Sequence, residues 1–113
     1  MMRVIVVDDD HDAVRTLSTL LEMKGITVEA KGYDGKEAVE LFRDHQPDAV
    51  LLDMMMPEFD GKYAIKQLKK EDENVKIIVL TAYKLNYEFE KNEVAAIFDK
   101  PYKISDVIKV INQ

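Results

Sequence analysis

Four apolar runs of this chain each lead to a polar side chain that can do chemistry. In a parallel sheet the carboxyl ends of the strands converge on one crevice, where ligands bind. Folded that way, these side chains would meet at one point, where they could hold a divalent cation and handle a phosphoryl group. They are Asp8 and Asp9 after residues 4–7, Asp53 after residues 49–52, Thr81 after residues 77–80, and Lys100 soon after residues 95–98.

The Asp8–Asp9 pair predicts a cation site. Adjacent carboxylates repel each other and are costly to hold together unless a cation intervenes. Mg²⁺ suits such a pair, because it needs only one or two carboxylates, keeps several waters and bridges to phosphate. The neighbouring Asp10 and Asp12 are equally compatible with a role in stabilising a helix N-terminus. A calcium-binding loop is excluded, because Ala13 occupies the position that such a loop needs for glycine.

Asp53 is a candidate nucleophile. A carboxylate can attack phosphorus and form an aspartyl-phosphate, provided that a metal and fixed dipoles neutralise the incoming oxygens. An aspartate after a strand is also a common start of a turn, so the residue alone does not decide the question. The backbone carbonyl of Met55 is a further candidate metal ligand. The methionines at 54–56 are otherwise expected to pack or to contact a partner.

Thr81 and Lys100 bring a hydroxyl and an ammonium to the same crevice. The Thr81 hydroxyl could bond a phosphoryl oxygen, and the small Ala82 beside it would leave room for the group. The Lys100 ammonium would pair with the Asp53 carboxylate and later with its phosphate. The alternatives are the ordinary strand preference of threonine and a solvated surface lysine.

Strands and helices alternate along the chain, which predicts parallel βαβ units with helices on both faces of a sheet. Gly25 ends the first helix, Asp34 caps the second, and Pro47 stops it. Residues 84–92 have a short, polar pattern that makes a poor helix. The expected strands are residues 4–7, 26–30, 49–52, 75–80 and 94–98. Helices are expected over about residues 12–24, between the cap at 34–37 and Pro47, around residues 64–68 to about residue 71, and over residues 104–111.

Composition restricts the class of protein. With 113 residues, one domain is expected. The net charge of −6 argues against a nucleic-acid surface, and the lack of cysteine excludes disulfides and thiolate metal sites. No apolar run approaches the ~18 residues needed to cross a bilayer, and the N-terminus lacks the form of a signal peptide. We therefore expect a cytoplasmic protein without membrane contacts.

Taken together, these motifs resemble the receiver domain of two-component response regulators from Val4 to Ile111. They are Val-Val-Asp-Asp-Asp, Leu-Leu-Asp-Met-Met-Met-Pro-x-x-Asp-Gly, Leu-Thr-Ala and Lys-Pro, in this order. The resemblance implies a doubly wound, flavodoxin-like α/β fold with five parallel strands in the order 2-1-3-4-5. It also implies that residues 1–113 form one receiver domain.

The resemblance further implies a phosphorelay function. The phosphoryl donor would be a phosphohistidine on a sensor histidine kinase or a histidine phosphotransfer protein, and the output would be a downstream protein target or a fused output domain. Such a domain catalyses only its own phosphorylation and slow dephosphorylation. The implied roles are phosphoacceptor for Asp53, magnesium ligands for Asp8, Asp9, Asp53 and the Met55 carbonyl, switch hydroxyl for Thr81, and phosphate-binding lysine for Lys100.

The implied switch departs from the usual pattern of the family. Receivers carry an aromatic residue or histidine three positions before the lysine, whereas this chain has Ile97 there and Phe98 one place later. The span from Thr81 to Lys100 is also shorter than usual, by about one helical turn. The helix expected within residues 84–92 is therefore short or irregular. The resemblance assigns a role in switching or in tuning hydrolysis to five residues: Met55, Ala82, Tyr83, Ile97 and Phe98.

Other functions are compatible with parts of the pattern. A degenerate receiver could act only as a protein-interaction module. A magnesium-dependent phosphatase of the haloacid-dehalogenase type would need a second aspartate at position 55, where the chain has Met55. A flavodoxin-like cofactor binder would need hydroxyls and glycines after the first strand, where carboxylates here would repel a phosphate. Both a stand-alone relay protein and a receiver within a longer chain fit the sequence.

Overall fold

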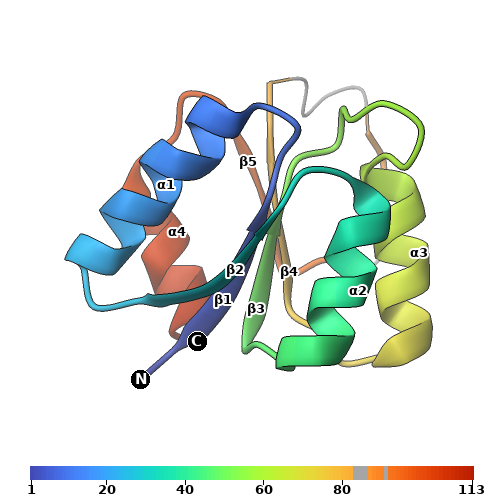
Figure 1. Cartoon of the computed structure of the whole chain (residues 1–113), viewed down its shortest axis with the longest axis horizontal. Helices are drawn as coiled ribbons and strands as arrows, with labels where there is room; N and C mark the ends of the chain where they lie inside the picture. Colours follow the sequence, from blue (N-terminus) through green and yellow to red (C-terminus); the bar gives the residue numbers. More distant parts are fainter. Residues whose placement is uncertain (83–86, 91) are drawn as a thin grey trace.

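A computed structural model describes residues 1–82, 87–90 and 92–113. Its centre is a five-stranded parallel sheet in the order β2-β1-β3-β4-β5 (Figure 1). This confirms the predicted doubly wound, flavodoxin-like α/β fold and places the second strand at an edge. The strands are β1 Arg3–Val7, β2 Thr27–Gly32, β3 Ala49–Leu52, β4 Ile77–Thr81 and β5 Ala96–Asp99.

Helices cover both faces of this sheet. In Figure 1, α1 and α4 lie on one face and α2 and α3 lie on the other. None of the helices in the described part of the chain is long and apolar enough to cross a membrane. The helices are α1 His11–Met23, α2 Gly35–His45, α3 Gly61–Glu71 and α4 Ile104–Ile111.

The apolar strands separate two hydrophobic layers. In β1, Ile5 and Val7 pack on the α2/α3 face, whereas Val4 and Val6 pack on the α1/α4 face. The alternation follows from the two-residue period of a strand. Because both faces are covered, β1 and β3 read as continuous apolar runs in the sequence.

Each of the first three helices begins with an aspartate cap close to the carboxyl end of a strand. The Asp10 carboxylate accepts hydrogen bonds from backbone N–H groups in the first turn of α1. The Asp34 carboxylate accepts from the N–H of Glu37 at the start of α2, as predicted. Asp60 caps α3 in the same way by accepting from the N–H of Tyr63. These caps satisfy donors that a helix start leaves unpaired.

The bounds predicted for three strands require correction. β2 covers Thr27–Gly32 rather than residues 26–30. β4 begins at Ile77 rather than at residue 75, because the N–H of Val75 bonds to the carbonyl of Asp72 in a turn. β5 covers Ala96–Asp99 rather than residues 94–98. Asp99 joins the ladder because it pairs with Thr81. The apolar pattern of the sequence follows burial, and Val75 is buried although it precedes β4. The same pattern missed the polar Asp99, which continues the ladder of β5.

The connection between β4 and β5 is only partly described. Residues 83–86 and 91, which include Tyr83 and much of the helix expected within 84–92, lie outside the described residues. The described residues 87–90 and 92 are not helical. Tyr87 and Phe89 from this segment pack against the α2/α3 layer.

Candidate functional site

The carboxyl edge of the sheet brings together the polar residues that the sequence singled out. Asp8 follows the end of β1 and Asp53 follows the end of β3, and the register pairs Val7 with Leu52 directly before them. Thr81 ends β4, and its partner Asp99 directly precedes Lys100. Neighbouring strands that end in register therefore deliver their terminal residues to the same place.

Lys100 joins the two buried carboxylates. Its Nζ donates a hydrogen bond to Oδ2 of Asp8 over 3.0 Å and lies 3.6 Å from Oδ1 of Asp53. Asp8 and Asp53 are each only 8% exposed. The sequence predicted a contact of Lys100 with Asp53. The shorter bond to Asp8 was not foreseen, because it depends on the side-chain torsions of a flexible lysine.

Asp8, Asp9 and Asp53 form a group that can hold a cation. One carboxylate oxygen from each residue lies within 4.8 Å of the other two. Oxygen ligands of Mg²⁺ lie about 2.1 Å from the ion, so opposite ligands are about 4.2 Å apart. Adjacent ligands are about 3.0 Å apart, so small side-chain rotations would bring the three oxygens to spacings that such an ion accepts. The donor set therefore fits a hard divalent cation.

Burial and the charges within this site shift the pKa values of Asp9, Asp53 and Lys100. Burial, assisted by the charge of Asp8, raises the pKa of Asp53 to about 6, although Lys100 opposes the shift. Burial and the neighbouring Asp8 also raise the pKa of Asp9. For Lys100, burial lowers the pKa, but the hydrogen bond to Asp8 and the charge of Asp53 outweigh it, so the net shift is upward. The site carries excess negative charge, which a cation would neutralise.

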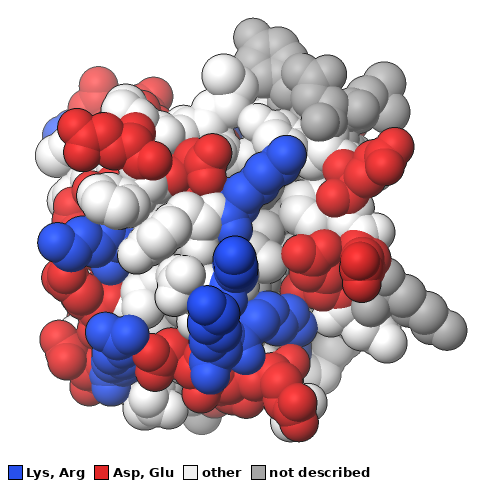
Figure 2. All heavy atoms as spheres, turned by 90° about the vertical axis from the view of Figure 1, so that its right-hand side faces the viewer, with Lys and Arg blue, Asp and Glu red and all other residues white. Residues whose placement is uncertain are grey.

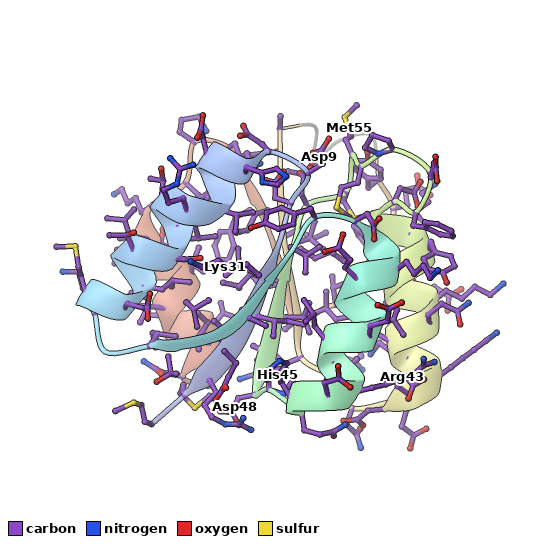
Figure 3. The ribbon with its side chains drawn as sticks, viewed as in Figure 1. Asp9, Lys31, Arg43, His45, Asp48 and Met55 are labelled. Atoms are coloured by element: carbon purple, nitrogen blue, oxygen red, sulfur yellow. The ribbon has the colours of Figure 1, made fainter. Side chains whose placement is uncertain are left out.

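The loop after Asp53 is clamped to the start of α3. The N–H of Gly61 donates to the carbonyl of Met54, and a Cβ at position 61 would lie 2.6 Å from the Met54 Cα. Met54 and Met56 are buried, as expected for packing methionines, whereas Met55 is 54% exposed. Figure 3 places the side chains of Met55 and Asp9 at the same upper edge of the molecule.

The candidate switch residues lie on both faces of the sheet. Thr81 is fully buried, Ala82 is exposed, and the N–H of Lys100 donates to the carbonyl of Thr81. Ile97 packs on the α2/α3 face, whereas Phe98 packs on the α1/α4 face. The aromatic ring of β5 is thus on the face opposite to the position that the family normally uses.

Sequence reasoning missed Tyr87. Its ring is half-buried, and the Lys62 ammonium lies 6.0 Å from the ring centroid. Burial, with the charges of Asp53 and Asp60, raises the pKa of the Tyr87 phenol. The available signal was a tyrosine in the β4–β5 connection of a chain that has Ile97 where an aromatic residue is usual.

The comparison with known families agrees with this arrangement. Residues 4–112 match the response regulator receiver domain family. The chain therefore belongs to the response regulator receiver domains of two-component systems.

Relatives and solved structures support the assignment. Response regulator MprA of Mycobacterium ulcerans is 42% identical over 81 residues, covering 72% of this chain and 34% of that protein. The chain thus spans about a third of the length of this relative. TrrA from Thermotoga maritima, in complex with Mg(2+)-BeF, superposes with a TM-score of 0.87 at 26% identity, covering 99% of this chain and 97% of that one. The receiver domain of Francisella response regulator 1452 gives a TM-score of 0.84 at 29% identity, with coverages of 99% and 94%.

Proposed function

We propose that residues 1–113 act as one receiver domain that accepts a phosphoryl group on Asp53. The donor is a phosphohistidine of a sensor histidine kinase or histidine phosphotransfer protein, which would act in the cytoplasm. The observation that carries the proposal is the position of the Asp53 carboxylate, beside Asp8 and within 3.6 Å of the Lys100 ammonium.

The chemistry assigned to Asp53 is an in-line displacement. A carboxylate oxygen attacks phosphorus, the P–N bond to the histidine breaks, and its electron pair returns to the imidazole, which takes up a proton. The attacking carboxylate must be ionised. With a pKa of about 6, Asp53 is mostly ionised at neutral pH even before a cation is bound. Later hydrolysis of the acyl phosphate by water would return the domain to its starting state slowly.

We assign a Mg²⁺ ion to Asp8, Asp9 and Asp53, with the Met55 backbone carbonyl as a further ligand. The carboxylate spacing and the raised pKa values of Asp9 and Asp53 support this assignment. When bound, the ion neutralises charge on the phosphoryl oxygens. The similarity to TrrA, whose structure contains Mg(2+)-BeF, is consistent with the same cation here.

Lys100 and Thr81 are assigned to the phosphorylated product. Lys100 already contacts Asp53, so its ammonium can pair with a phosphoryl oxygen after small rotations. Thr81 closes the neighbouring strand, and its hydroxyl would bond another phosphoryl oxygen. Contacts that exist only in the phosphorylated state shift the population of conformations around β4 and β5. A downstream protein or a fused output domain would read that shift.

The alternative functions lack comparable support. A phosphatase of the haloacid-dehalogenase type requires an acid where Met55 stands, and this side chain cannot protonate a leaving group. A degenerate receiver would lack part of the acidic group or the lysine, whereas Asp8, Asp53 and Lys100 lie in mutual contact. We therefore retain phosphoacceptance as the proposed activity.

The proposal is tested with acetyl phosphate as a small phosphoryl donor. With Mg²⁺, the intact mass of the chain should rise by one phosphoryl group, and Asp53→Asn should abolish the increase. Asp12→Asn is the matched control, because Asp12 is an exposed carboxylate in the first turn of α1. Phosphoryl uptake by Asp53→Asn at the wild-type level would remove Asp53 from its assigned role.

A further inference from the structure

Tyr87 lies in the connection between β4 and β5 and packs against the α2/α3 face of the sheet. Phe89, Val94 and Ile97 pack against the same hydrophobic layer on that face. This layer also contains Met54 and the β4 residue Val79, two positions before Thr81. Tyr87 therefore lies against the layer that continues into both the Asp53 loop and the end of β4.

The same ring contacts the beginning of α3. The Lys62 ammonium lies 6.0 Å from its centroid, a separation at which a cation is attracted to an aromatic face. Lys62 follows Gly61, whose N–H bonds to the carbonyl of Met54 directly after Asp53. Figure 2 looks onto this side of the molecule, where basic side chains (Lys and Arg) form a band. Tyr87 is thus linked to the Asp53 loop through one short run of contacts.

The electrostatic environment of Tyr87 includes the phosphoacceptor site. Burial is the main cause of the raised pKa of its phenol, and the charges of Asp53 and Asp60 add to it. A change in the charge at Asp53 would therefore be felt at the Tyr87 ring. In β5, by contrast, Phe98 packs on the opposite face of the sheet, and Ile97 has no ring.

We propose that Tyr87, held between Lys62 and the α2/α3 layer, is the positioning residue that couples residues 87–90 to phosphorylation of Asp53. The inference rests on the proposed phosphoacceptor function and adds a route for its output. Phosphorylation replaces one carboxylate charge by a group of roughly two negative charges. That group attracts the Lys62 ammonium and the phenolic hydroxyl, and it repels the electron-rich ring face. The Tyr87–Lys62 contact rearranges, and residues 87–90 move with it.

The direct test is fluorine NMR of the full chain labelled with 3-fluorotyrosine, in which Tyr87→Phe assigns the Tyr87 resonance. Mg²⁺ and beryllofluoride are added as a phosphoryl mimic, and bound beryllofluoride gives its own fluorine signal in the same spectrum. We expect the Tyr87 resonance to move, and to move further than that of Tyr33, which stacks on His11 next to α1. A spectrum without bound beryllofluoride contradicts the proposed function. Bound beryllofluoride with an unmoved Tyr87 resonance contradicts the present inference.

Variants separate coupling from simple packing. The readout is the change in the backbone amide resonances of Val94 and Ile97 when beryllofluoride binds. Tyr87→Leu should reduce this change at least severalfold, whereas Phe89→Leu, a matched loss of a ring from the same segment, should preserve it. Equal loss in both variants, or a wild-type response in Tyr87→Leu, overturns the inference.

A further variant covers the case in which Tyr87→Leu does not fold. Lys62→Met keeps the α3 helix and removes the cation over the ring, because Lys62 is exposed. The displacement of the Tyr87 fluorine resonance by beryllofluoride should then fall at least twofold. Lys66→Met, one helical turn further along α3, is the control and should leave the displacement unchanged. An unchanged response in Lys62→Met also counts against the inference.

Discussion

The Lys100 ammonium donates its hydrogen bond to Asp8, with Nζ and Oδ2 separated by 3.0 Å. It lies 0.6 Å further from Asp53, at 3.6 Å rather than 3.0 Å. Lys100 is therefore shared between a proposed metal ligand and the proposed phosphoacceptor. One positive charge partly neutralises both carboxylates before any cation is present, so Lys100 and a metal ion compete for the same negative charge.

Replacing Lys100 by methionine should tighten Mg²⁺ binding and slow phosphorylation. Removing the ammonium eliminates a repulsion of the incoming cation, which at an effective dielectric of about 20 amounts to at least about 1 kcal/mol, or roughly fivefold in affinity. Titration of the apo protein with Mg²⁺ by calorimetry measures the first effect. Lys103→Met, which removes an exposed lysine at the start of α4, should change neither quantity. Weaker Mg²⁺ binding by Lys100→Met would contradict the assigned competition.

Asp53→Asn should stabilise the metal-free protein at neutral pH. The carboxyl has a pKa of about 6 when folded and 3.8 as its ordinary value, so the folded state binds the proton more tightly. The stability of the wild type therefore falls as pH rises from about 4 to about 6, by at most about 3 kcal/mol. The neutral asparagine side chain does not titrate, so Asp53→Asn does not lose this stability as pH rises.

Urea unfolding in a chelator measures this difference. We expect Asp53→Asn to be more stable by about 1–3 kcal/mol at pH 7, and the advantage to shrink below about pH 4, where the wild-type carboxyl is protonated in both states. Added Mg²⁺ should narrow the difference at pH 7, because only the wild type retains the full ligand set. A less stable Asp53→Asn at pH 7 without metal would contradict the electrostatic description of the site.

Much of the fold followed from the sequence because its main signals are local. Buried strands such as β3 read as unbroken apolar runs, and Asp34 marked the start of α2. The site was predictable in outline, since parallel strands must deliver Asp8 and Asp53 to one edge. The contacts of Lys100 and Tyr87 depend on side-chain torsions and on an irregular segment, for which no periodic pattern exists.

Ser18→Ala should preserve or raise stability. Ser18 lies in α1 and is 1% exposed, and its hydroxyl has no hydrogen-bond partner among the described residues. A buried hydroxyl without a partner costs about 1–3 kcal/mol, and alanine also favours the helix. We expect a gain of about 0.5–1.5 kcal/mol in urea unfolding. Ser105→Ala, at an exposed position of α4, is the control. A loss of stability above about 1 kcal/mol in Ser18→Ala would contradict the prediction, because it would mean that the Ser18 hydroxyl makes a stabilising hydrogen bond.

Arg3→Met should lower stability without affecting phosphorylation. The Arg3 guanidinium pairs with Glu29 of β2 and donates to the carbonyls of His45 and Gln46 at the end of α2. Figure 3 shows His45 at the edge of the sheet opposite to Asp9 and Met55, and therefore away from the proposed site. Loss of these charged hydrogen bonds should cost about 1–3 kcal/mol.

The control for Arg3 is Arg15→Met. Within the described part of the chain, Arg15 forms an ion pair with the exposed Asp12 alone, and both side chains are largely solvated. Exposed pairs contribute about 0–1 kcal/mol, so this variant should unfold nearly as the wild type does. Equal losses in Arg3→Met and Arg15→Met would show that the Arg3 contacts do not hold the ends of β1, β2 and α2 together.

The central claim is that the carboxylate of Asp53, and no neighbouring carboxylate, takes up the phosphoryl group. Borohydride reduces an acyl phosphate to an alcohol, which converts the modified aspartate to homoserine. After treatment with acetyl phosphate and Mg²⁺, peptide mass mapping should find homoserine at position 53 alone. Homoserine at position 8 or 9, or none in a chain that has gained a phosphoryl group, would contradict the account.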